Sequence, residues 1–267
     1  MSKIPCSVEI LTRNSEKTLG RCLESIKDFD DIIVLDGNST DKTREIAARY
    51  GARILKQYDI DEPNIQIKDY AEVRNKGLRL AKYDWFMFID SDEYLSKEAA
   101  EEIRSITESQ NPSADAFWQP RLYVLDGKII KCATTYPNQQ IRLFRRNGAD
   151  GFIKPVHEKI KLKEGARMGI LKNFEYVPID PPEVLSRRWR RYLEAELKMV
   201  EGASRKKIVR LMVRHLLLFS LYAMRFLRNL IFCRGLRMPL RNEWARHSYS
   251  LRTAGRLIML LFGYNQR

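Results

Sequence analysis

The fold is indicated most clearly by residues 85–93, which read WFMFIDSDE. The apolar run 85–89 is typical of a strand that is buried on both faces, as strands of parallel sheets are. The run ends at two carboxylates, Asp90 and Asp92, with Ser91 between them. Carboxylates this close repel each other unless a cation is shared, and hard oxygen ligands suit Mg²⁺ or Mn²⁺. The pattern therefore predicts either a metal site at the end of a buried strand or a solvated loop that leads into the next helix.

The residues before this segment alternate further strand patterns with helix patterns. Strands are predicted at 7–11, 32–35 and 52–55, and helices at about 19–26, 41–50 and 71–81. Such alternation implies right-handed crossovers and a mainly parallel sheet that is covered on both faces. From residue 115 the pattern changes to hairpin-like strands, predicted at 116–125, 129–133 and 140–144. We therefore predict an α/β fold with a mainly parallel sheet and a mixed edge.

Charge divides the chain of 267 residues into two regions. Residues 1–184 carry 29 Lys and Arg against 30 Asp and Glu, whereas residues 185–267 carry 19 against 4. Prolines at 178, 181 and 182 mark the boundary, and the pattern beyond them is helical. We expect an α/β catalytic domain at 1–184 and a helical cationic extension at 185–267, used for membrane association or oligomerisation.

The cysteines and the hydropathy of the chain indicate the cellular compartment in which it is expected. The cysteines form no CxxC pair and are far apart, so neither a zinc site nor a disulfide framework is predicted, and a reducing compartment is expected. The first residues lack the apolar stretch of a signal peptide, and no segment reaches the roughly 18 apolar residues of a membrane span. The cysteines concerned are Cys6, Cys22, Cys132 and Cys233.

Polar residues follow three of the predicted strands. Thr12 and Asn14 come after the first strand, Asp36 after the second and Asp90 after the fourth. Ligands of open parallel sheets bind outside the carboxyl ends of the strands, where these side chains should converge. The chain has no GxGxxG after its first strand and no GxxxxGK[ST], which argues against a Rossmann dehydrogenase and a P-loop NTPase. A bound diphosphate would then be held by a metal rather than by a glycine-rich loop.

Five segments resemble, in order and spacing, the family 2 glycosyltransferases of GT-A fold, which are Rossmann-like. They read ILTRN at 10–14, IVLDGNSTD at 33–41, AEVRNKG at 71–77, FIDSDE at 88–93, and QIRLFR at 140–145 followed by PVHE at 155–158. The last of them looks like the branch that includes lipopolysaccharide-core β-1,4-glucosyltransferases. The resemblance covers about residues 5–165. It departs from the family at Leu11, where many members have proline, and at Gly37, where many carry a second aspartate.

The resemblance implies a nucleotide site at the first strands. Thr12, Asn14 and Asp36 would contact the nucleotide, with Asp36 accepting a hydrogen bond from the uracil N–H. Arg74 would lie near the diphosphate. Asp90, with Ser91 beside it, would contact the ribose or the transferred sugar.

The resemblance also implies a metal ligand, Asp92, for Mg²⁺ or Mn²⁺, and a late acidic residue as the general base. Glu158 stands at the matching place, and an inverting transfer needs a carboxylate that takes the proton of the acceptor hydroxyl. The alternative is a surface residue paired with Lys159 or Lys161. His157 is interpreted as a hydrogen-bonded structural residue rather than a metal ligand.

Two further groups of residues have open interpretations. Arg142 and Arg145 alternate with apolar residues, which predicts a basic strand face that grips the diphosphate or an exposed edge that blocks strand pairing. Trp118 and Tyr136 are candidates for stacking on an acceptor sugar, or for core and edge aromatics.

The cationic region 185–267 places arginines among large apolar residues, a composition that suits an anionic membrane surface. The other interpretation is that its helices pack on the α/β domain and on each other, or in a homo-oligomer, with the arginines solvated. Nucleic acid is not expected as a partner, because the region has no known reader motif and the acidic edge of the sheet would repel phosphates.

These observations predict a metal-dependent, inverting glycosyltransferase that moves a hexose from a UDP-sugar to a lipid-linked or lipopolysaccharide-core acceptor. We expect it in the cytoplasm, peripheral at the inner face of the plasma membrane. The alternatives are a catalytically degenerate sugar-nucleotide-binding scaffold at the membrane and a sugar nucleotidyltransferase. The latter class normally opens with a glycine-rich basic phosphate loop, which this sequence lacks.

Overall fold

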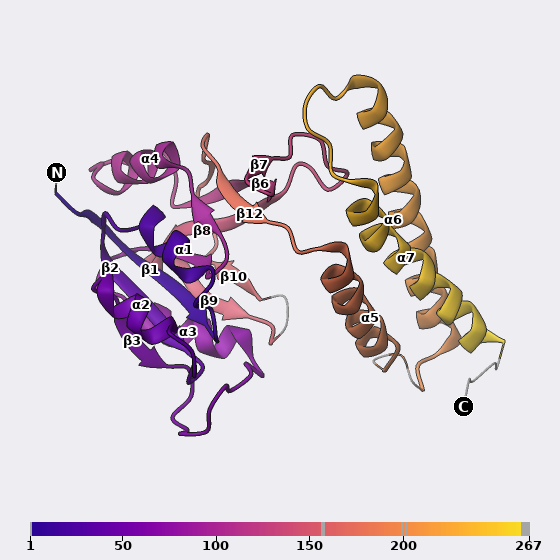
Figure 1. Cartoon of the computed structure of the whole chain (residues 1–267), viewed down its shortest axis with the longest axis horizontal. Helices are drawn as coiled ribbons and strands as arrows, with labels where there is room; N and C mark the ends of the chain where they lie inside the picture. Colours follow the sequence, from indigo (N-terminus) through magenta and orange to yellow (C-terminus); the bar gives the residue numbers. More distant parts are fainter. Residues whose placement is uncertain (1, 156–157, 199, 201, 263–267) are drawn as a thin grey trace. The chain divides into compact units, whose positions relative to one another are not determined.

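The computed structural model describes residues 2–155, 158–198, 200 and 202–262 (Figure 1). The chain forms two compact units. The first, here called the sheet unit, comprises residues 1–122 and 137–178, and the second, the helical unit, comprises 123–136 and 179–267. The division differs from the one predicted at residue 184, because the hairpin region 123–136 groups with the C-terminal helices.

The first part of the sheet unit is a parallel β/α arrangement. Its strands are β1 (Ile4–Thr12), β2 (Phe29–Asp36), β3 (Arg53–Lys56) and β4 (Trp85–Asp90). Its helices are α1 (Leu19–Ser25), α2 (Thr43–Arg49) and α3 (Tyr70–Leu80). The strands lie in the order β3-β2-β1-β4, and each neighbouring pair is parallel. The predicted α/β fold with a mainly parallel sheet is confirmed.

The strand register brings three strand ends to one edge of the sheet. Thr12, the last residue of β1, lies opposite Asp36, the last residue of β2. On the other side of β1, Leu11 lies opposite Asp90, the last residue of β4. This edge is therefore where the candidate site begins.

The rest of the sheet unit supplies the mixed edge. β8 runs antiparallel to both β4 and β6, and the order continues β8-β6-β12-β5. β10 and β9 form a separate antiparallel pair. The elements are β5 (Tyr94–Leu95), α4 (Lys97–Thr107), β6 (Ala116–Leu125), β7 (Lys128–Ile129), β8 (Gln139–Arg145), the 3₁₀ turn η1 (Arg146–Gly148), β9 (Ala149–Ile153), β10 (Lys159–Leu162), β11 (Met168–Ile170) and β12 (Glu175–Pro178).

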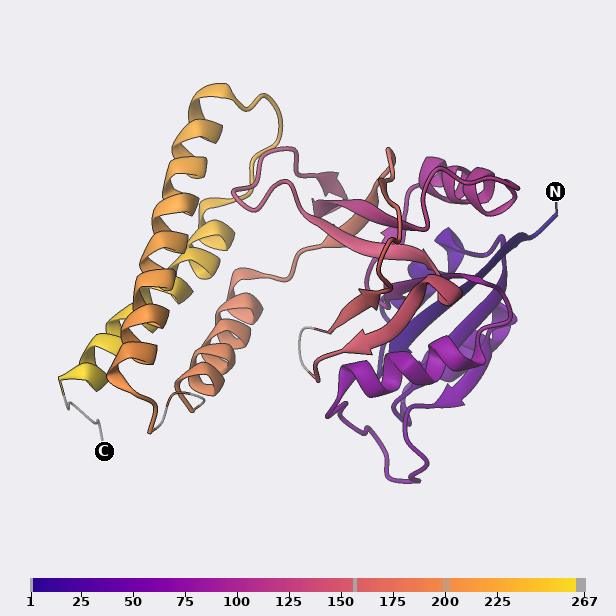
Figure 2. The same cartoon turned by 180° about the vertical axis from the view of Figure 1, so that it is seen from behind.

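Each central strand is buried on both faces, as its apolar run predicts. Alternate residues of β4 enter two clusters: Trp85, Met87 and Ile89 pack with residues of α1 and α4, whereas Phe86 and Phe88 pack with residues of α3 and β9. Figures 1 and 2 show these helices and strands from two sides. Full burial of one such side chain stabilises the fold by about 1.5–3 kcal/mol. The two clusters hold the strand ends at fixed positions.

The helical unit contains α5 (Pro182–Lys198), α6 (Arg205–Phe232) and α7 (Leu240–Leu261), which confirms the predicted helical extension. Its apolar core includes Val200, Ile208 and Leu257. The segment 123–136 is attached to α7 by hydrogen bonds, since Thr134 donates from Oγ1 to Glu243 at 2.6 Å and from its backbone N–H at 2.9 Å.

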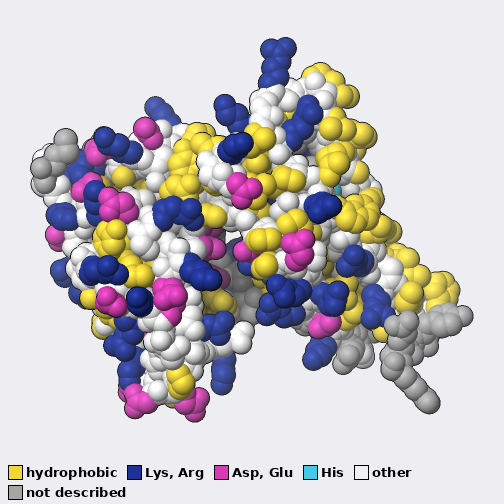
Figure 3. Space-filling model, viewed as in Figure 1, with side chains coloured by type: hydrophobic (Ala, Val, Ile, Leu, Met, Phe, Trp, Pro, Cys, Tyr) yellow, Lys and Arg dark blue, Asp and Glu magenta, His cyan; other side chains and the backbone are white. Residues whose placement is uncertain are grey.

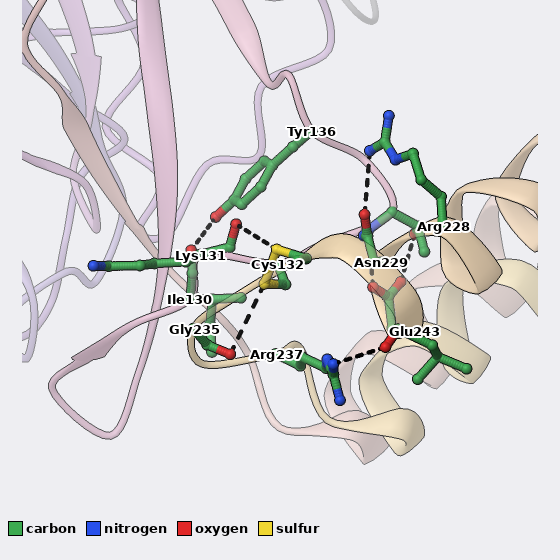
Figure 4. Close-up of a disulfide and its surroundings, with 12 residues drawn as sticks. Ile130, Lys131, Cys132, Tyr136, Arg228, Asn229, Gly235, Arg237 and Glu243 are labelled. Atoms are coloured by element: carbon green, nitrogen blue, oxygen red, sulfur yellow. Dashed lines mark hydrogen bonds between the residues drawn. A yellow bond between two sulfur atoms is a disulfide. The ribbon is translucent and has the colours of Figure 1, made fainter.

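A disulfide within the helical unit joins Cys132 to Cys233, which follows α6 (Figure 4). The backbone N–H of Met238 donates to the carbonyl of Cys132 at 2.9 Å and keeps this region together. The expectation that the sequence contains no disulfide is therefore wrong. The two cysteines are separated by 101 residues, so the sequence pattern alone gave no sign of their proximity.

Within the described part of the chain, no helix combines the length and the apolar character needed to cross a membrane.

Candidate active site

The loops after β1 and β2 are tied together at the sheet edge. Asp36 is buried and accepts hydrogen bonds from Thr12 Oγ1 at 2.8 Å, from Ser39 N at 2.8 Å and from Ser39 Oγ at 2.6 Å. Asn14 accepts from the backbone N–H of Thr40 at 2.9 Å. Its φ of 49° is left-handed, a conformation that asparagine tolerates better than most residues. Thr12, Asn14 and Asp36 are thus brought together.

Gly37 lies where a side chain would not fit. A Cβ at this position would lie 2.8 Å from the carbonyl oxygen of Ile65 and 2.9 Å from Oε1 of Gln57. Gln57 itself is fixed, because its Nε2 donates to the carbonyls of Thr12 and Leu35 at 3.0 Å each. A second aspartate after Asp36 would not fit without a backbone shift.

Asp90, at the end of β4, lies between two buried arginines. Arg74 Nη2 donates to its Oδ1 at 2.8 Å, and Arg142 Nη2 donates to its Oδ2 at 3.1 Å. Burial alone would raise the pKa of Asp90, but the charges of Arg142 and Arg74 hold it well below its usual range. Asp90 is therefore a fixed anion at neutral pH.

Phe88 holds the two arginines in place. The guanidinium carbon of Arg74 and that of Arg142 each lie 4.6 Å from the centroid of the Phe88 ring. A guanidinium over an aromatic face is attracted by the ring quadrupole, and more so when it is desolvated. Phe88 and Asp90, two residues apart on one strand, therefore act together on the same pair of side chains.

Arg142 contacts further carboxylates and is fully buried. Its Nη2 lies 3.3 Å from Glu175 Oε1 and also pairs with Glu93. Burial would lower the pKa of Arg142, but the nearby charges of Glu175, Asp90 and Glu93 raise it above its usual range. Burial and the charge of Glu175 raise the pKa of Glu93 well above normal.

The predicted basic face of β8 is not present. Arg142 lies over Phe88 and Arg145 lies over Trp85, residues that belong to the two different clusters. Positions three apart on a strand face opposite sides, because side chains alternate with a period of two. Arg142, which the sequence assigned to the diphosphate, here pairs with buried carboxylates and holds Asp90 instead.

Glu9 is a buried acid that the sequence analysis did not identify as a site residue. It lies in the middle of β1, and its Oε1 is 4.0 Å from Arg74 Nη1. Gly77 of α3 leaves room for it, since a Cβ there would lie 2.7 Å from the Glu9 carboxyl carbon. Burial raises the pKa of Glu9 to about 8, against the lowering effect of Arg74. The available signal was a charged residue inside an apolar strand.

Glu158 lies beside the same arginine as Asp90. Its Oε1 is 3.5 Å from Arg74 Nε, and its side chain is 15% exposed. The alternative interpretation, a surface residue paired with a neighbouring lysine, is not what the structure shows, since Lys161 pairs with Asp150 at 2.9 Å. His157 lies outside the described residues.

A cavity of about 480 Å³ opens beside Glu158 and Asp90. Trp118, which is 37% exposed, also borders it. The other residues that line it are Phe88, Gln139, Gln140, Ile141, Lys159 and Ile160. Tyr136, the second aromatic candidate, instead stacks on Tyr123 with ring centroids 5.4 Å apart.

A second hollow, of about 620 Å³, lies at the loop after β1. Ser91 and Asp92 line it together with Asp41 and residues 14–18. Ser91 Oγ is 3.0 Å from Ser15 Oγ, and Asp92 is exposed. Successive residues of the 90–92 segment thus border two different cavities. Such an arrangement can place a proton acceptor on one side and oxygen ligands for a cation on the other.

A family model described as Glycosyl transferase family 2 matches residues 7–129.

Several curated proteins are similar to somewhat more than half of this chain. An uncharacterized glycosyltransferase of Rickettsia bellii is 35% identical over 145 residues, which are 54% of this chain and 47% of that protein. A TPR repeat-containing protein of Synechococcus elongatus is 34% identical over 156 residues, which are 58% of this chain and 35% of that protein. The prophage-derived glycosyltransferase SunS of Bacillus subtilis is 32% identical over 158 residues, which are 56% of this chain and 33% of that protein. The chain spans about a third to a half of the length of these relatives.

Among solved structures, S. aureus TarS 1–349 in complex with UDP-GlcNAc is 17% identical, with a TM-score of 0.47, over 98% of this chain and 82% of that chain. Glucosyl-3-phosphoglycerate synthase from Mycobacterium tuberculosis, in complex with Mn²⁺, UDP and glucosyl-3-phosphoglycerate, is 24% identical, with a TM-score of 0.35, over 45% of this chain and 44% of that chain.

Proposed function

We propose that this chain transfers a hexose from a UDP-sugar to an acceptor hydroxyl with inversion. The match of residues 7–129 to the model of glycosyl transferase family 2 and the mainly parallel α/β sheet support this proposal. One observation carries the proposal. Asp90 and Glu158 contact the same buried arginine, Arg74, at the wall of one cavity. A proton acceptor and a fixed anion thus flank a space that is large enough for a sugar.

The donor nucleotide is assigned to the loops after β1 and β2. The Asp36 carboxylate offers about four acceptor positions, and Thr12 and Ser39 use three of them. We assign the uracil N–H to Asp36, with Thr12 and Asn14 at the same loops. Asp90 and Ser91 would contact the ribose or the sugar.

The hollow beside Asp92 fits Mg²⁺ or Mn²⁺. Its lining offers oxygen ligands, which hard cations prefer: the carboxylate of Asp92 and the hydroxyls of Ser91 and Ser15. Among the residues that the structure describes, no group of three or more His, Cys, Asp or Glu side chains gathers to hold a metal alone. Mg²⁺ is usually held by one or two carboxylates plus substrate phosphates, so Asp92 and the UDP diphosphate would suffice. When bound, the ion supplies positive charge against the departing diphosphate.

Glu158 is assigned as the general base. It takes the proton from the acceptor hydroxyl as that oxygen bonds to the anomeric carbon, on the face opposite UDP. The bond between the anomeric carbon and the diphosphate oxygen breaks, and its electron pair leaves with UDP. Arg74 Nε lies 3.5 Å from Glu158 Oε1 and holds this carboxyl group at the cavity wall. Trp118, on the wall of the same cavity, is placed to stack on the acceptor sugar.

The acceptor we propose is a lipid-linked glycan or a lipopolysaccharide core, reached from an anionic membrane surface. α6 exposes large apolar side chains at helical spacing, including Leu217, Met224 and Ile231, which are 65%, 61% and 73% exposed. Figure 3 shows hydrophobic side chains along α6 and α7 with Lys and Arg side chains beside them. Apolar insertion and attraction of cations to anionic lipids add together in such a surface. The helices also pack on one another, so packing and membrane contact involve different faces.

The proposed location is the cytoplasmic side of the plasma membrane. Thiols are usually kept reduced in that compartment, so the disulfide between Cys132 and Cys233 argues against this location, and its state in the cell decides between the cytoplasm and an oxidising compartment. Maleimide labelling of the chain in freshly lysed cells, with and without prior reduction, would measure this. Labelling of both residues only after reduction would place the chain in an oxidising compartment instead.

The proposed function is tested by thermal unfolding with a panel of nucleotide sugars, with and without Mn²⁺. A ligand that binds only the folded chain raises its unfolding temperature, and we expect UDP-hexoses to do so more strongly with Mn²⁺. Release of UDP on addition of an acceptor glycan would then show transfer. Binding of UDP-sugars without turnover would identify a scaffold, and synthesis of UDP-sugar from UTP would identify a nucleotidyltransferase.

A further inference from the structure

A groove of about 480 Å³ runs between α5 and α7, entirely within the helical unit. On α5 it is lined at positions 186, 189, 193 and 197, and on α7 at positions 245, 248, 252, 255 and 259. These positions recur at three or four residues, so the groove follows one face of each helix. At a rise of about 1.5 Å per residue, the α5 wall is about 16 Å long. The groove is therefore long and narrow rather than round.

The walls of the groove are mostly apolar. Trp189 and Tyr249 lie against each other with ring centroids 5.0 Å apart, and Leu193, Leu197 and Met259 extend the surface. The α7 wall also contains the small residues Ala245, Ser248 and Gly255.

Gly255 makes the groove open at its α7 wall. A Cβ at this position would meet nothing within 4 Å, so the space beside it is not filled by the protein. Core interiors are packed more closely than this, and few voids larger than a water molecule remain in them. The open volume is thus a feature that a ligand could use.

Arginines border the apolar walls. Arg190 on α5 and Arg252 and Arg256 on α7 line the groove, against one acidic residue, Glu194. Arginine pairs well with phosphate through parallel hydrogen bonds. The groove therefore combines an apolar channel with an excess of positive charge at its border.

We propose that this groove binds one acyl chain of an anionic phospholipid, with the lipid phosphate among the arginines. The inference deepens the proposed membrane attachment and rests on it for the choice of lipid. A peptide is a poorer fit, because mostly apolar walls would leave its backbone groups without hydrogen-bond partners. A free phosphate could pair with the arginines but has no apolar part to fill the channel.

The test is calorimetric titration of the full chain with a monomeric lipid, lauroyl lysophosphatidic acid, below its critical micelle concentration. Lauroyl lysophosphatidylcholine, which carries the same chain and no net charge, and glycerol 3-phosphate, which lacks the chain, are the comparison ligands. We expect each to bind at least about tenfold more weakly than lysophosphatidic acid. Equal binding of the choline lipid would overturn the role of the arginines, and equal binding of glycerol phosphate would overturn that of the channel.

Matched variants locate the site. Arg190→Gln with Arg252→Gln removes two charges from the groove, and Arg187→Gln with Arg241→Gln removes two exposed charges from the same helices outside it. The first pair should weaken lysophosphatidic acid binding about tenfold or more, and the second should leave it unchanged. Equal effects of the two pairs would mean general electrostatic attraction and overturn the site.

Filling the groove gives a second test. Gly255→Leu places a side chain in the open space and should abolish lipid binding, whereas Gly255→Ala should retain it. Thermal unfolding checks that both variants fold, and UDP-sugar binding should be the same in both. Lipid binding by Gly255→Leu at the original affinity would refute the groove. Lipid binding in a chain that fails to bind UDP-sugars would refute the proposed donor instead, so the two failures are distinguishable.

Discussion

Arginine serves different purposes in the two units of this molecule. In the sheet unit, Arg74 and Arg142 are 2% and 0% exposed and are surrounded by carboxylates. In the helical unit, Arg187, Arg241 and Arg252 are exposed on helices that also expose large apolar side chains. The same residue type holds buried carboxylates in one unit and places charge on the surface in the other.

The difference follows from desolvation. A buried arginine has lost its hydration, so removal of its partner or of the arginine itself leaves an uncompensated charge in a medium of low dielectric. An exposed arginine keeps its water and its interactions are screened by salt. Charges of the sheet unit should therefore affect folding and catalysis, whereas those of the helical unit should affect association with anionic partners.

The largest expected effect is on transfer at Asp92. Asp92→Asn removes the carboxylate proposed to bind the metal, and we expect a loss of turnover of more than ~10³-fold, because the metal contributes several kcal/mol to transition-state stabilisation. UDP binding in Mn²⁺ should weaken as well. Asp61→Asn is the control, since Asp61 is 97% exposed and lies on a surface loop. If Asp92→Asn turned over at the original rate, the proposed metal site in the sheet unit would be wrong. The role proposed for the 90–92 segment would then be wrong as well.

Glu158→Gln should separate binding from chemistry. The amide keeps the shape of the side chain but cannot accept the proton, so we expect kcat to fall by about 10²–10⁴-fold while UDP-sugar binding is nearly unchanged. The measurement is UDP release with a soluble acceptor, compared with calorimetric donor binding. Glu164→Gln, an exposed loop change, is the control. Equal losses of binding and turnover would indicate a structural role for Glu158 and place the base elsewhere.

Arg142→Gln and Arg187→Gln test the contrast between the units directly. The first removes one guanidinium from the buried Glu93 and Glu175 and from Asp90, while Arg121 and Arg74 still pair with these carboxylates. We therefore expect it to destabilise the fold by about 3 kcal/mol, the lower end of the range for a broken buried pair. The second removes an exposed charge and should change stability by less than about 0.5 kcal/mol. Denaturant unfolding of both variants gives the comparison. Similar free energies of unfolding would mean that the ion pairs of Arg142 add no net stability to the fold.

The parts predicted from the sequence are those with short-range signals. The apolar runs predicted the parallel strands. The parallel topology then predicted that Thr12, Asp36 and Asp90 lie at one edge of the sheet, and the strand registers confirm this. The helical C-terminal region was likewise evident from its pattern.

The parts that were missed depend on contacts between distant residues. The pairing of Cys132 with Cys233 spans 101 residues, and the carboxylates around Arg142 come from β4, β12 and the turn between β4 and β5. The single basic face expected for β8 conflicted with the two-residue period of a strand, which puts Arg142 and Arg145 on opposite sides. Glu9 had a local signal, a charge within an apolar strand, but its partner Arg74 lies on α3.

A separate effect is expected at Glu9, on the dependence of stability on pH. Its pKa in the folded chain is about 8, raised by burial from an ordinary value of 4.5. Between these pH values the folded chain keeps a proton on Glu9 that the unfolded chain has lost, so raising the pH lowers the free energy of unfolding. The slope from this group is roughly 1.4 kcal/mol per pH unit, present from about pH 5 to pH 8.

Glu9→Gln removes the titration while keeping a neutral side chain of the same shape. We therefore expect the variant to lose this slope and to be more stable than the original chain at pH 8, with little difference below pH 4.5. Urea unfolding at several pH values measures it, and Glu164→Gln should reproduce the original pH dependence. An unchanged slope in Glu9→Gln would show that Glu9 is ionised in the folded chain and paired with Arg74. In that case Glu9 and Asp90 both carry charge beside Arg74, and burial does not neutralise Glu9.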